Sequence, residues 1–168
     1  MALFEQIKGF GDYGFPESHS ASFALLVYVS AWIKRYYPEV FAAALLNSQP
    51  MGFYAPAQLV REARRHGVEV RPVTVGRSAW DCSLERGAGE SGSRDKGLPP
   101  ALRLGLRLVK GLSRPVAERL AAARRQAPFL SVADLARRVG LRQKDLRSLA
   151  AAGALAGLAG NRHQAGWE

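Results

Sequence analysis

The chain has 168 residues, of which 48% are hydrophobic and 23% charged, and its formal net charge is +10. These values are ordinary for a globular protein, so they exclude extensive disorder, and the length allows one or two domains with a buried core. Cys82 is the only cysteine; it excludes an intrachain disulfide and lacks the neighbours that a zinc site requires, so we expect a small buried side chain and a cytoplasmic protein.

The positive charge is concentrated in the last part of the chain. Residues 101–168 contain 13 Lys and Arg against 4 Asp and Glu, whereas residues 1–72 contain 7 against 6 and residues 73–100 contain 4 against 4. A localised positive field attracts a polyanion and holds its phosphates. Nucleic acid is therefore the first partner that the sequence predicts.

In chain order, the first half of the sequence predicts three helices. Each begins at or just after a proline, and the predicted ranges are 18–36, 38–46 and from 56 to a stop at Gly67. The apolar stretch Phe23–Ile33 is too short to span a membrane and predicts a buried helix.

The middle of the chain predicts two short strands and a surface loop. Residues 68–75 alternate between apolar and polar, as a half-buried strand does, and Pro72 limits that strand to a sheet edge. Residues 86–100 are rich in Gly, Ser and charge, which predicts a flexible loop. Leucines at every second position from Leu102 to Leu108 predict a second strand, which we expect to pair with residues 80–84.

The basic segment predicts more helices, at residues 115–125, 132–138 and 143–152, and a last one from about Asn161. The pairs Arg124-Arg125 and Arg137-Arg138 end two of these helices and suit the negative end of the helix dipole. The predicted fold class is mainly α with a few short β-strands.

Two glycine turns in the basic segment each lead into a helix N-terminus, in the pattern of helix-hairpin-helix units. Unpaired backbone N–H groups and the dipole favour an anion there, so we expect sequence-independent, salt-sensitive contacts to a nucleic-acid backbone. The alternative is a solvated basic face on a helical bundle. The candidate backbone-binding residues are Lys110, Gly111, Ser113, Arg114, Gly140, Arg142 and Lys144.

The stretch from Gly9 to Phe23 is the least ordinary part of the sequence. Its glycines precede a helix, but no strand or βαβ unit accompanies them, so we reject a dinucleotide-binding turn. His19 lies in a Ser-His-Ser cluster and is either a buried, satisfied histidine or part of a surface that offers hydrogen bonds to a base or phosphate. The chain shows no nucleophile–base pair and no metal-ligand spacing, so we expect no active site within it.

Three separated motifs carry a resemblance to a known family. They are FGDYGFPESHSASF at 10–23, LLNSQPMGFY at 45–54 and RRHGVEV at 64–70. The chain resembles bacterial C-family DNA polymerases, the polymerase III alpha subunit and its relatives, and within them the error-prone, damage-associated branch. The resemblance covers essentially the whole chain. Pro16 and Glu17 stand where the replicative enzymes have Asn and Lys, so the charge of the family's lysine is reversed.

The resemblance implies a division of the chain. Residues 1–85 would be the C-terminal part of the fingers domain, 86–100 a flexible loop, 101–158 a tandem helix-hairpin-helix region, and 159–168 the start of a truncated following segment. Residues carried over to the neighbourhood of the nascent base pair and template are Tyr13, Gly14, Ser18, His19 and Ser20.

The resemblance also implies the function of a longer parent protein. That protein would be a DNA-directed DNA polymerase, a nucleotidyltransferase of DNA replication and damage-induced translesion synthesis or repair. Its divalent metal, Mg²⁺, would be held by a preceding palm domain, so we expect no catalytic residue, no bound cofactor and no polymerisation from this fragment.

The expected partners are primer–template DNA, a deoxynucleoside triphosphate in the parent enzyme, a sliding clamp and other damage-response proteins, with no membrane contact. Two other interpretations remain open. The chain could be a stand-alone helix-hairpin-helix adaptor that binds nucleic acid without catalysis, or a structural helical protein whose basic face serves solubility.

Overall fold

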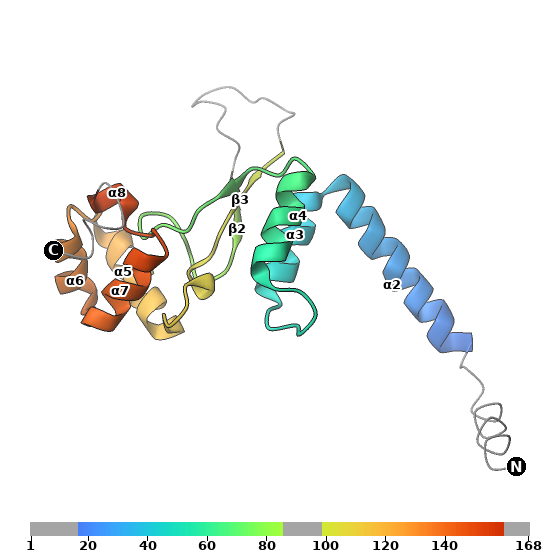
Figure 1. Cartoon of the computed structure of the whole chain (residues 1–168), viewed down its shortest axis with the longest axis horizontal. Coiled ribbons are helices and arrows are strands. Elements are labelled where there is room, and N and C mark those ends of the chain that lie inside the picture. Colours follow the sequence, from blue (N-terminus) through green and yellow to red (C-terminus); the bar gives the residue numbers. More distant parts are fainter. Residues whose placement is uncertain (1–16, 86–98, 160–168) are drawn as a thin grey trace, which may run out of the picture. The chain divides into compact units, whose positions relative to one another are not determined.

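The computed structural model describes residues 17–85 and 99–159. The chain forms two compact units, residues 1–37 and 38–168, and each is described by itself (Figure 1). The described part of the first unit is helical, and that of the second combines helices with a small sheet. The predicted class, mainly α with a few short strands, is confirmed.

The first unit contains α2 (Glu17–Tyr36), close to its predicted range. Its expected burial is not found within this unit, because Phe23, Leu26 and Tyr28 are all more than half exposed. The Trp32 ring contacts the Tyr36 ring, with centroids 5.2 Å apart. A helix that is apolar on most sides is typical of a buried element, so α2 is a helix without a partner in the part of its unit that is described. No helix of the described residues is long and apolar enough to cross a bilayer.

The second unit begins with two helices packed on a three-stranded sheet. Helices α3 (Pro38–Asn47) and α4 (Pro56–Arg65) lie against strands β1 (Val70–Arg71), β2 (Ser83–Glu85) and β3 (Ala101–Arg103). The strand order is β1-β3-β2, with β3 parallel to β1 and antiparallel to β2. The core between helices and sheet includes Leu46, Ala63, Val68, Cys82 and Leu102.

Cys82 is the small buried side chain that the sequence predicts. It is 5% exposed, and its Sγ accepts the Gly105 N–H at 3.3 Å. Burial raises the pKa of its thiol, so the neutral form that packs in a core is favoured.

The predicted strand at 68–75 is shorter than expected. Regular pairing stops at Arg71, because Pro72 follows and has no N–H to donate. The alternation of burial shifts by one residue at Pro72, so that Val68 packs in the core beside the sheet, whereas Val73 and Val75 pack in a second core formed by the C-terminal helices. One short segment therefore contributes to both cores.

The predicted strand at 102–108 is right in its first half and wrong in its second. Leu102 pairs with Leu84, as expected, but residues Leu106–Leu108 form the 3₁₀ helix η1. The change occurs at Gly105, where an added Cβ would come within 2.4 Å of the Trp80 oxygen. Only glycine allows the two backbones to approach this closely, and the chain turns there instead of continuing as a strand.

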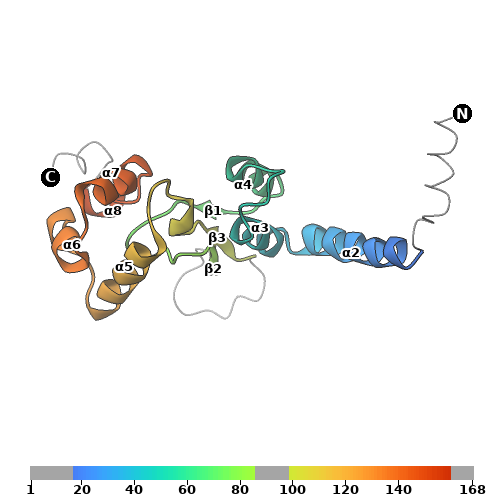
Figure 2. The same ribbon diagram turned by 90° about the horizontal axis from the view of Figure 1, so that it is seen from below.

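The C-terminal part of the second unit is helical (Figure 2). Helices α5 (Arg114–Gln126), α6 (Val132–Val139) and α7 (Gln143–Ala151) match the predicted ones to within a residue or so. The short α8 (Ala156–Ala159) was not predicted, and the helix predicted near Asn161 lies outside the described residues, as do residues 86–98 of the predicted loop. The core of this part is lined by Leu106, Leu120, Leu135, Leu149 and Leu155, all fully buried.

Arginines join separate segments of the second unit by donating to backbone carbonyls. Arg124, on α5, lies 2.9 Å from the Val75 oxygen and 3.1 Å from the Ser78 oxygen. Arg138, at the end of α6, lies 2.9 Å from the Ala127 oxygen that follows α5. In the described part of residues 101–168, the arginines with such bonds are Arg103, Arg107, Arg119, Arg124 and Arg138. A substantial share of the basic excess therefore holds the fold together.

An ion network crosses the sheet. Arg103 is 9% exposed and binds Glu85 through two hydrogen bonds of 3.0 and 2.8 Å, and its third donor reaches the Pro72 oxygen at 2.8 Å. Arg71 donates to the same carboxylate at 2.9 Å. The Arg103 hydrogen bonds, followed by those of Arg71, lower the pKa of Glu85 to about 2 against the opposing effect of burial.

We predict that Glu85→Gln destabilises the chain by roughly 3 kcal/mol at pH 7, because it leaves the buried Arg103 without its counter-charge. The lowered pKa means that the wild-type carboxylate stabilises the fold fully above pH 4.5, progressively less as the pH falls, and no longer below about pH 2. Chemical denaturation of both proteins at several pH values measures this, and the difference should shrink toward low pH.

Glu69→Gln is the matched control, since Glu69 is half exposed and binds only Arg71 in this network. It should cost less than about 1 kcal/mol. Equal losses from the two variants, or a difference that does not change with pH, would contradict the assignment.

Candidate nucleic-acid interface

Two turns of the second unit have the same local construction. Gly111 has φ +85° and Gly140 has φ +67°, in the left-handed region that favours glycine. Each glycine is followed by a leucine that packs on the same core, Leu112 or Leu141, and then by an extended residue that precedes a helix. The first turn leads into α5 and the second connects α6 to α7, so the two predicted helix-hairpin-helix turns are present.

The second hairpin carries its own anion. The Asp145 carboxylate, 2% exposed, accepts the Arg142 N–H at 3.2 Å and lies 3.8 Å from the Arg142 guanidinium. Asp145 is the third residue of α7, where a carboxylate faces the unpaired N–H groups and the positive end of the dipole. This helix N-terminus is thus already occupied by a negative group of the protein.

The first hairpin has no such carboxylate. Aligning Gly111 with Gly140 places Val116 at the position of Asp145, and Val116 is an apolar side chain, 3% exposed. Ser113, the residue before α5, makes no side-chain cap hydrogen bond, and no carboxylate takes the place that Asp145 has in α7. The positive end of α5 therefore keeps its affinity for an anion from outside.

The residues that face the two hairpins also differ. Arg119 of α5 donates to the Val139 oxygen at 3.1 Å, next to the second glycine. The equivalent residue of α7 is Ser148, whose Oγ would lie 3.1 Å from a Cβ added at Gly111. The first hairpin is thus faced by a small hydroxyl side chain where the second is faced by a long arginine.

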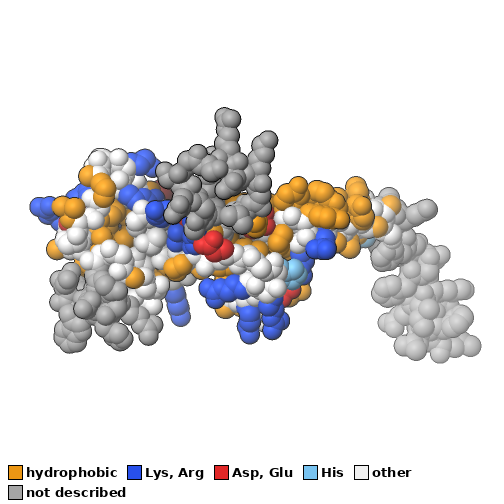
Figure 3. Space-filling view, turned by 90° about the horizontal axis from the view of Figure 1, so that it is seen from above, with side chains coloured by type: hydrophobic (Ala, Val, Ile, Leu, Met, Phe, Trp, Pro, Cys, Tyr) orange, Lys and Arg blue, Asp and Glu red, His pale blue; other side chains and the backbone are white. Residues whose placement is uncertain are grey.

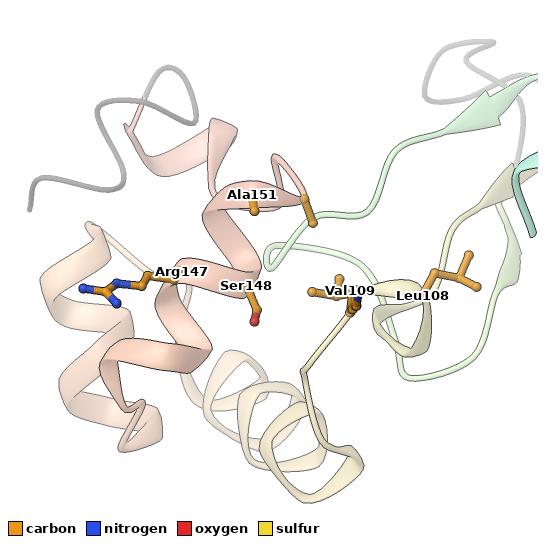
Figure 4. A pocket seen from close by; sticks show the side chains of 7 residues that line it. Leu108, Val109, Arg147, Ser148 and Ala151 are labelled. Carbon is orange, nitrogen blue, oxygen red and sulfur yellow. The ribbon is translucent and has the colours of Figure 1, made fainter.

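A hollow of about 480 Å³ lies beside the first hairpin, between η1 and α7. Its lining includes Val109, Lys110, Ser148 and Ala151. Figure 4 shows Ser148 pointing from α7 toward Val109, whereas Arg147 points to the opposite side. The hollow therefore leaves open space beside Lys110.

The structure brings the predicted backbone-binding residues together in two sets. Lys110, Gly111, Ser113 and Arg114 form the first hairpin and are all exposed, and Arg114 is bridged to Glu118 at 2.9 Å. The second set is Gly140, Arg142 and Lys144, also exposed. The sequence analysis did not identify Ser148, Arg119 and Asp145. Equivalent residues of the two hairpins lie at equal distances along the chain from Gly111 and Gly140, and this spacing could have revealed them.

Positive side chains are spread over several parts of the second unit on the face that Figure 3 shows. Those of α4, Arg61, Arg64 and Arg65, are exposed. The charged surface therefore extends beyond the two hairpins.

The candidate nucleotide-proximal residues belong to the first unit. Tyr13 and Gly14 lie outside the described residues, and Ser18 lies in α2. His19 and Ser20 are exposed in the first turns of α2, and the His19 ring contacts the Phe23 ring at 4.3 Å between centroids. The exposure of His19 in this unit agrees with the interpretation as part of a surface and not with a buried histidine.

The described residues contain no group of three or more His, Cys, Asp or Glu that could hold a metal ion. Apart from the carboxylates of Asp145 and Glu118, the charged groups described at the hairpins are the positive side chains of Lys110, Arg114, Arg142 and Lys144. Such an arrangement can bind phosphate oxygens in the described region, and it supplies no nucleophile.

We predict that Asp145→Asn lowers the free energy of unfolding by roughly 1 kcal/mol, because the charged partner of the α7 N-terminus is lost. Chemical denaturation measures the change. Glu118→Gln is the control, since this carboxylate on α5 is exposed and its bridge to Arg114 should be worth less than about 0.5 kcal/mol. An Asp145→Asn protein as stable as the control would show that the carboxylate does not serve as the cap.

The family model for the helix-hairpin-helix motif matches residues 67–165 of the chain. The chain is 64% identical to the error-prone DNA polymerase of Alkalilimnicola ehrlichii, over 99% of its own length and 15% of that protein. It is 60% identical to the one from Methylococcus capsulatus, over 99% and 17%, and 56% identical to the one from Pseudomonas aeruginosa, over 98% and 15%. The chain thus spans about a sixth of the curated relatives that it matches. It belongs to the helix-hairpin-helix motif family, and along its whole length it is similar to one segment of error-prone DNA polymerases.

Proposed function

We propose that the chain is a segment of an error-prone DNA-directed DNA polymerase that acts in DNA replication and in damage-induced translesion synthesis or repair in the cytoplasm. The observation that carries this proposal is the 64% identity over 99% of the chain to a protein of that name. In the proposed parent enzyme, a nucleotidyltransferase, residues 1–85 belong to the fingers, 101–158 hold the duplex, and 159–168 begin the next segment.

In this proposal, the first hairpin makes the principal contact with a phosphate of the duplex. An α5 N-terminus without a capping side chain, the exposed Lys110 and the hollow beside Gly111 all support it. Backbone N–H groups and a lysine contact phosphates without reading bases, which suits an enzyme that must copy any sequence.

The second hairpin has a different part in the proposal. The Asp145 carboxylate already accepts the N–H of Arg142, the residue before α7, so a phosphate beside it would be repelled by the buried carboxylate. Arg142, whose side chain is 72% exposed, and the exposed Lys144 instead reach phosphates by their side chains. The two hairpins then contribute unequally to the affinity for the duplex.

The remaining parts of the proposal concern the longer protein. Tyr13, Gly14, Ser18, His19 and Ser20 lie near the nascent base pair and the incoming deoxynucleoside triphosphate. The Mg²⁺ of the reaction is held by a palm domain of the parent enzyme. A sliding clamp and other damage-response proteins are its partners.

The alternative is a stand-alone adaptor with the same hairpins. Such an adaptor has no need of α2, whose apolar side chains are exposed in the described part of their own unit. Reading the gene upstream of Met1 discriminates between the two: an open frame encoding an aspartate-bearing palm supports the polymerase, and unrelated sequence supports the adaptor.

We predict that the chain binds blunt duplex DNA without sequence preference and that its affinity falls steeply with salt. Lys110→Ala/Arg114→Ala should weaken binding by about tenfold or more and reduce the slope of log affinity against log salt by about 2, since two phosphate contacts are lost. Arg142→Ala/Lys144→Ala should have the smaller effect, and the quadruple variant should lose most of the affinity. Fluorescence anisotropy over a series of salt concentrations measures all of them.

Arg64→Ala/Arg65→Ala is the matched control, because it removes the same charge from the C-terminal end of α4. Its binding should remain close to that of the wild type. A quadruple variant that binds as well as the wild type would show that the interface lies elsewhere, and equal effects of the two hairpin pairs would refute their inequality.

A further inference from the structure

Two adjacent aromatic side chains are exposed on the loop between α3 and α4. Phe53 is 88% exposed and Tyr54 is 59% exposed. The other large apolar side chains exposed in the described part of the second unit are Val40, Leu84 and Leu130, on α3, β2 and the connector between α5 and α6. The aromatic pair is therefore a separate feature and does not continue into a broad apolar patch.

The loop that carries the pair is braced from within. The Gln49 side chain spans it: its Oε1 accepts the Met51 N–H at 3.2 Å, and its Nε2 donates to the Tyr54 oxygen at 3.1 Å. At its far end, the Gln58 side chain accepts the Ala55 N–H at 3.0 Å. These bonds fix the backbone under the aromatic residues, so their rings are presented to solvent by an ordered loop.

The base of the loop is tied to the segment that forms the first hairpin. Arg107 of η1 donates to the Asn47 oxygen and, at 2.9 Å, to the Gln49 oxygen, and it is bridged to Asp81 at 2.8 Å. Lys110 follows Arg107 by three residues. A single guanidinium thus ties the base of the loop to η1, the segment that leads into the first hairpin.

The chemistry around the loop favours a nucleic acid. Arg61, on the helix that begins two residues after Tyr54, is exposed, and so are Lys110 and Arg114 of the first hairpin in the same unit. Aromatic rings with basic neighbours are the elements by which proteins hold single strands, because every base offers a flat face on which to stack. A protein partner would instead call for a wider apolar core around the two rings than this loop offers.

We propose that Phe53 and Tyr54 stack on unpaired bases of single-stranded DNA that continues from the duplex held at the first hairpin. The inference rests on the proposed function, since it assumes a DNA junction at this unit. It adds a binding element for the single strand that acts without sequence preference. The pair would hold the strand beyond the duplex while the hairpin holds the phosphates of the double-stranded part.

The test compares a blunt duplex with the same duplex bearing a single-stranded extension. The wild-type chain should bind the extended DNA more tightly, and Phe53→Ala/Tyr54→Ala should lose about tenfold of affinity for it, as expected for losing the stacking of a base or two, while binding to the blunt duplex is unchanged. A fluorescent adenine analogue in the extension should be quenched by the wild type and should stay bright with the variant. Phe53→Tyr/Tyr54→Phe, which keeps both rings, should behave like the wild type.

Leu130→Ala is the control, because Leu130 is 87% exposed and lies on the connector between α5 and α6. It should leave both affinities and the quenching unchanged. If the variant without the aromatic pair binds the extended DNA as tightly as the wild type, and the chain still binds the blunt duplex, the stacking proposal is wrong. The proposed function survives this result, and the loop is then assigned to a contact with a protein. A wild-type chain that binds neither DNA would overturn both proposals.

Discussion

Guanidinium groups that donate to backbone carbonyls are the interaction on which the second unit depends. Arg124 joins α5 to the segment that follows β1, Arg138 joins α6 to the end of α5, and Arg107 joins η1 to the loop after α3. A guanidinium can serve several carbonyls at once because its donors form a rigid, always charged fork, which a lysine cannot reproduce. In this protein a share of the arginines therefore serves the fold, whereas Lys110, Arg142 and Lys144 are exposed.

The helices could be predicted because their signals are local. Pro38, Pro56 and Gly67 mark boundaries that the structure keeps within a residue or two, and the two hairpin glycines have the positive φ that their turns require. The end of the second predicted strand could not be foreseen from Leu102–Leu108, because a leucine at every second position is also compatible with a 3₁₀ turn. The strand ends where it does because Gly105 contacts the backbone of Trp80, about 25 positions earlier in the chain. No local sequence pattern reports this contact.

The candidate site shows the same contrast between local signals and other contacts. The charge beside a glycine turn was enough to select Lys110 and Arg142 as candidates, but that reasoning treated the two hairpins as equivalent. The two hairpins differ at two pairs of equivalent positions. The second hairpin has the buried Asp145 where the first has Val116, and it is faced by Arg119 where the first is faced by Ser148. Two copies of one motif have thus kept the same backbone while one of them fills its own anion site.

The segment from Val68 to Val75 has a consequence for how the second unit opens. Because its valines enter both cores in turn, separating it from the sheet also removes Val73 and Val75 from among the C-terminal helices. Neither core can lose this segment while the other stays intact, so the sheet and the hairpins form one cooperative unit with a common opening free energy. Amide protons in β3 and in α5 should then exchange with solvent through the same rare event, and strain on the hairpins would be transmitted to the sheet.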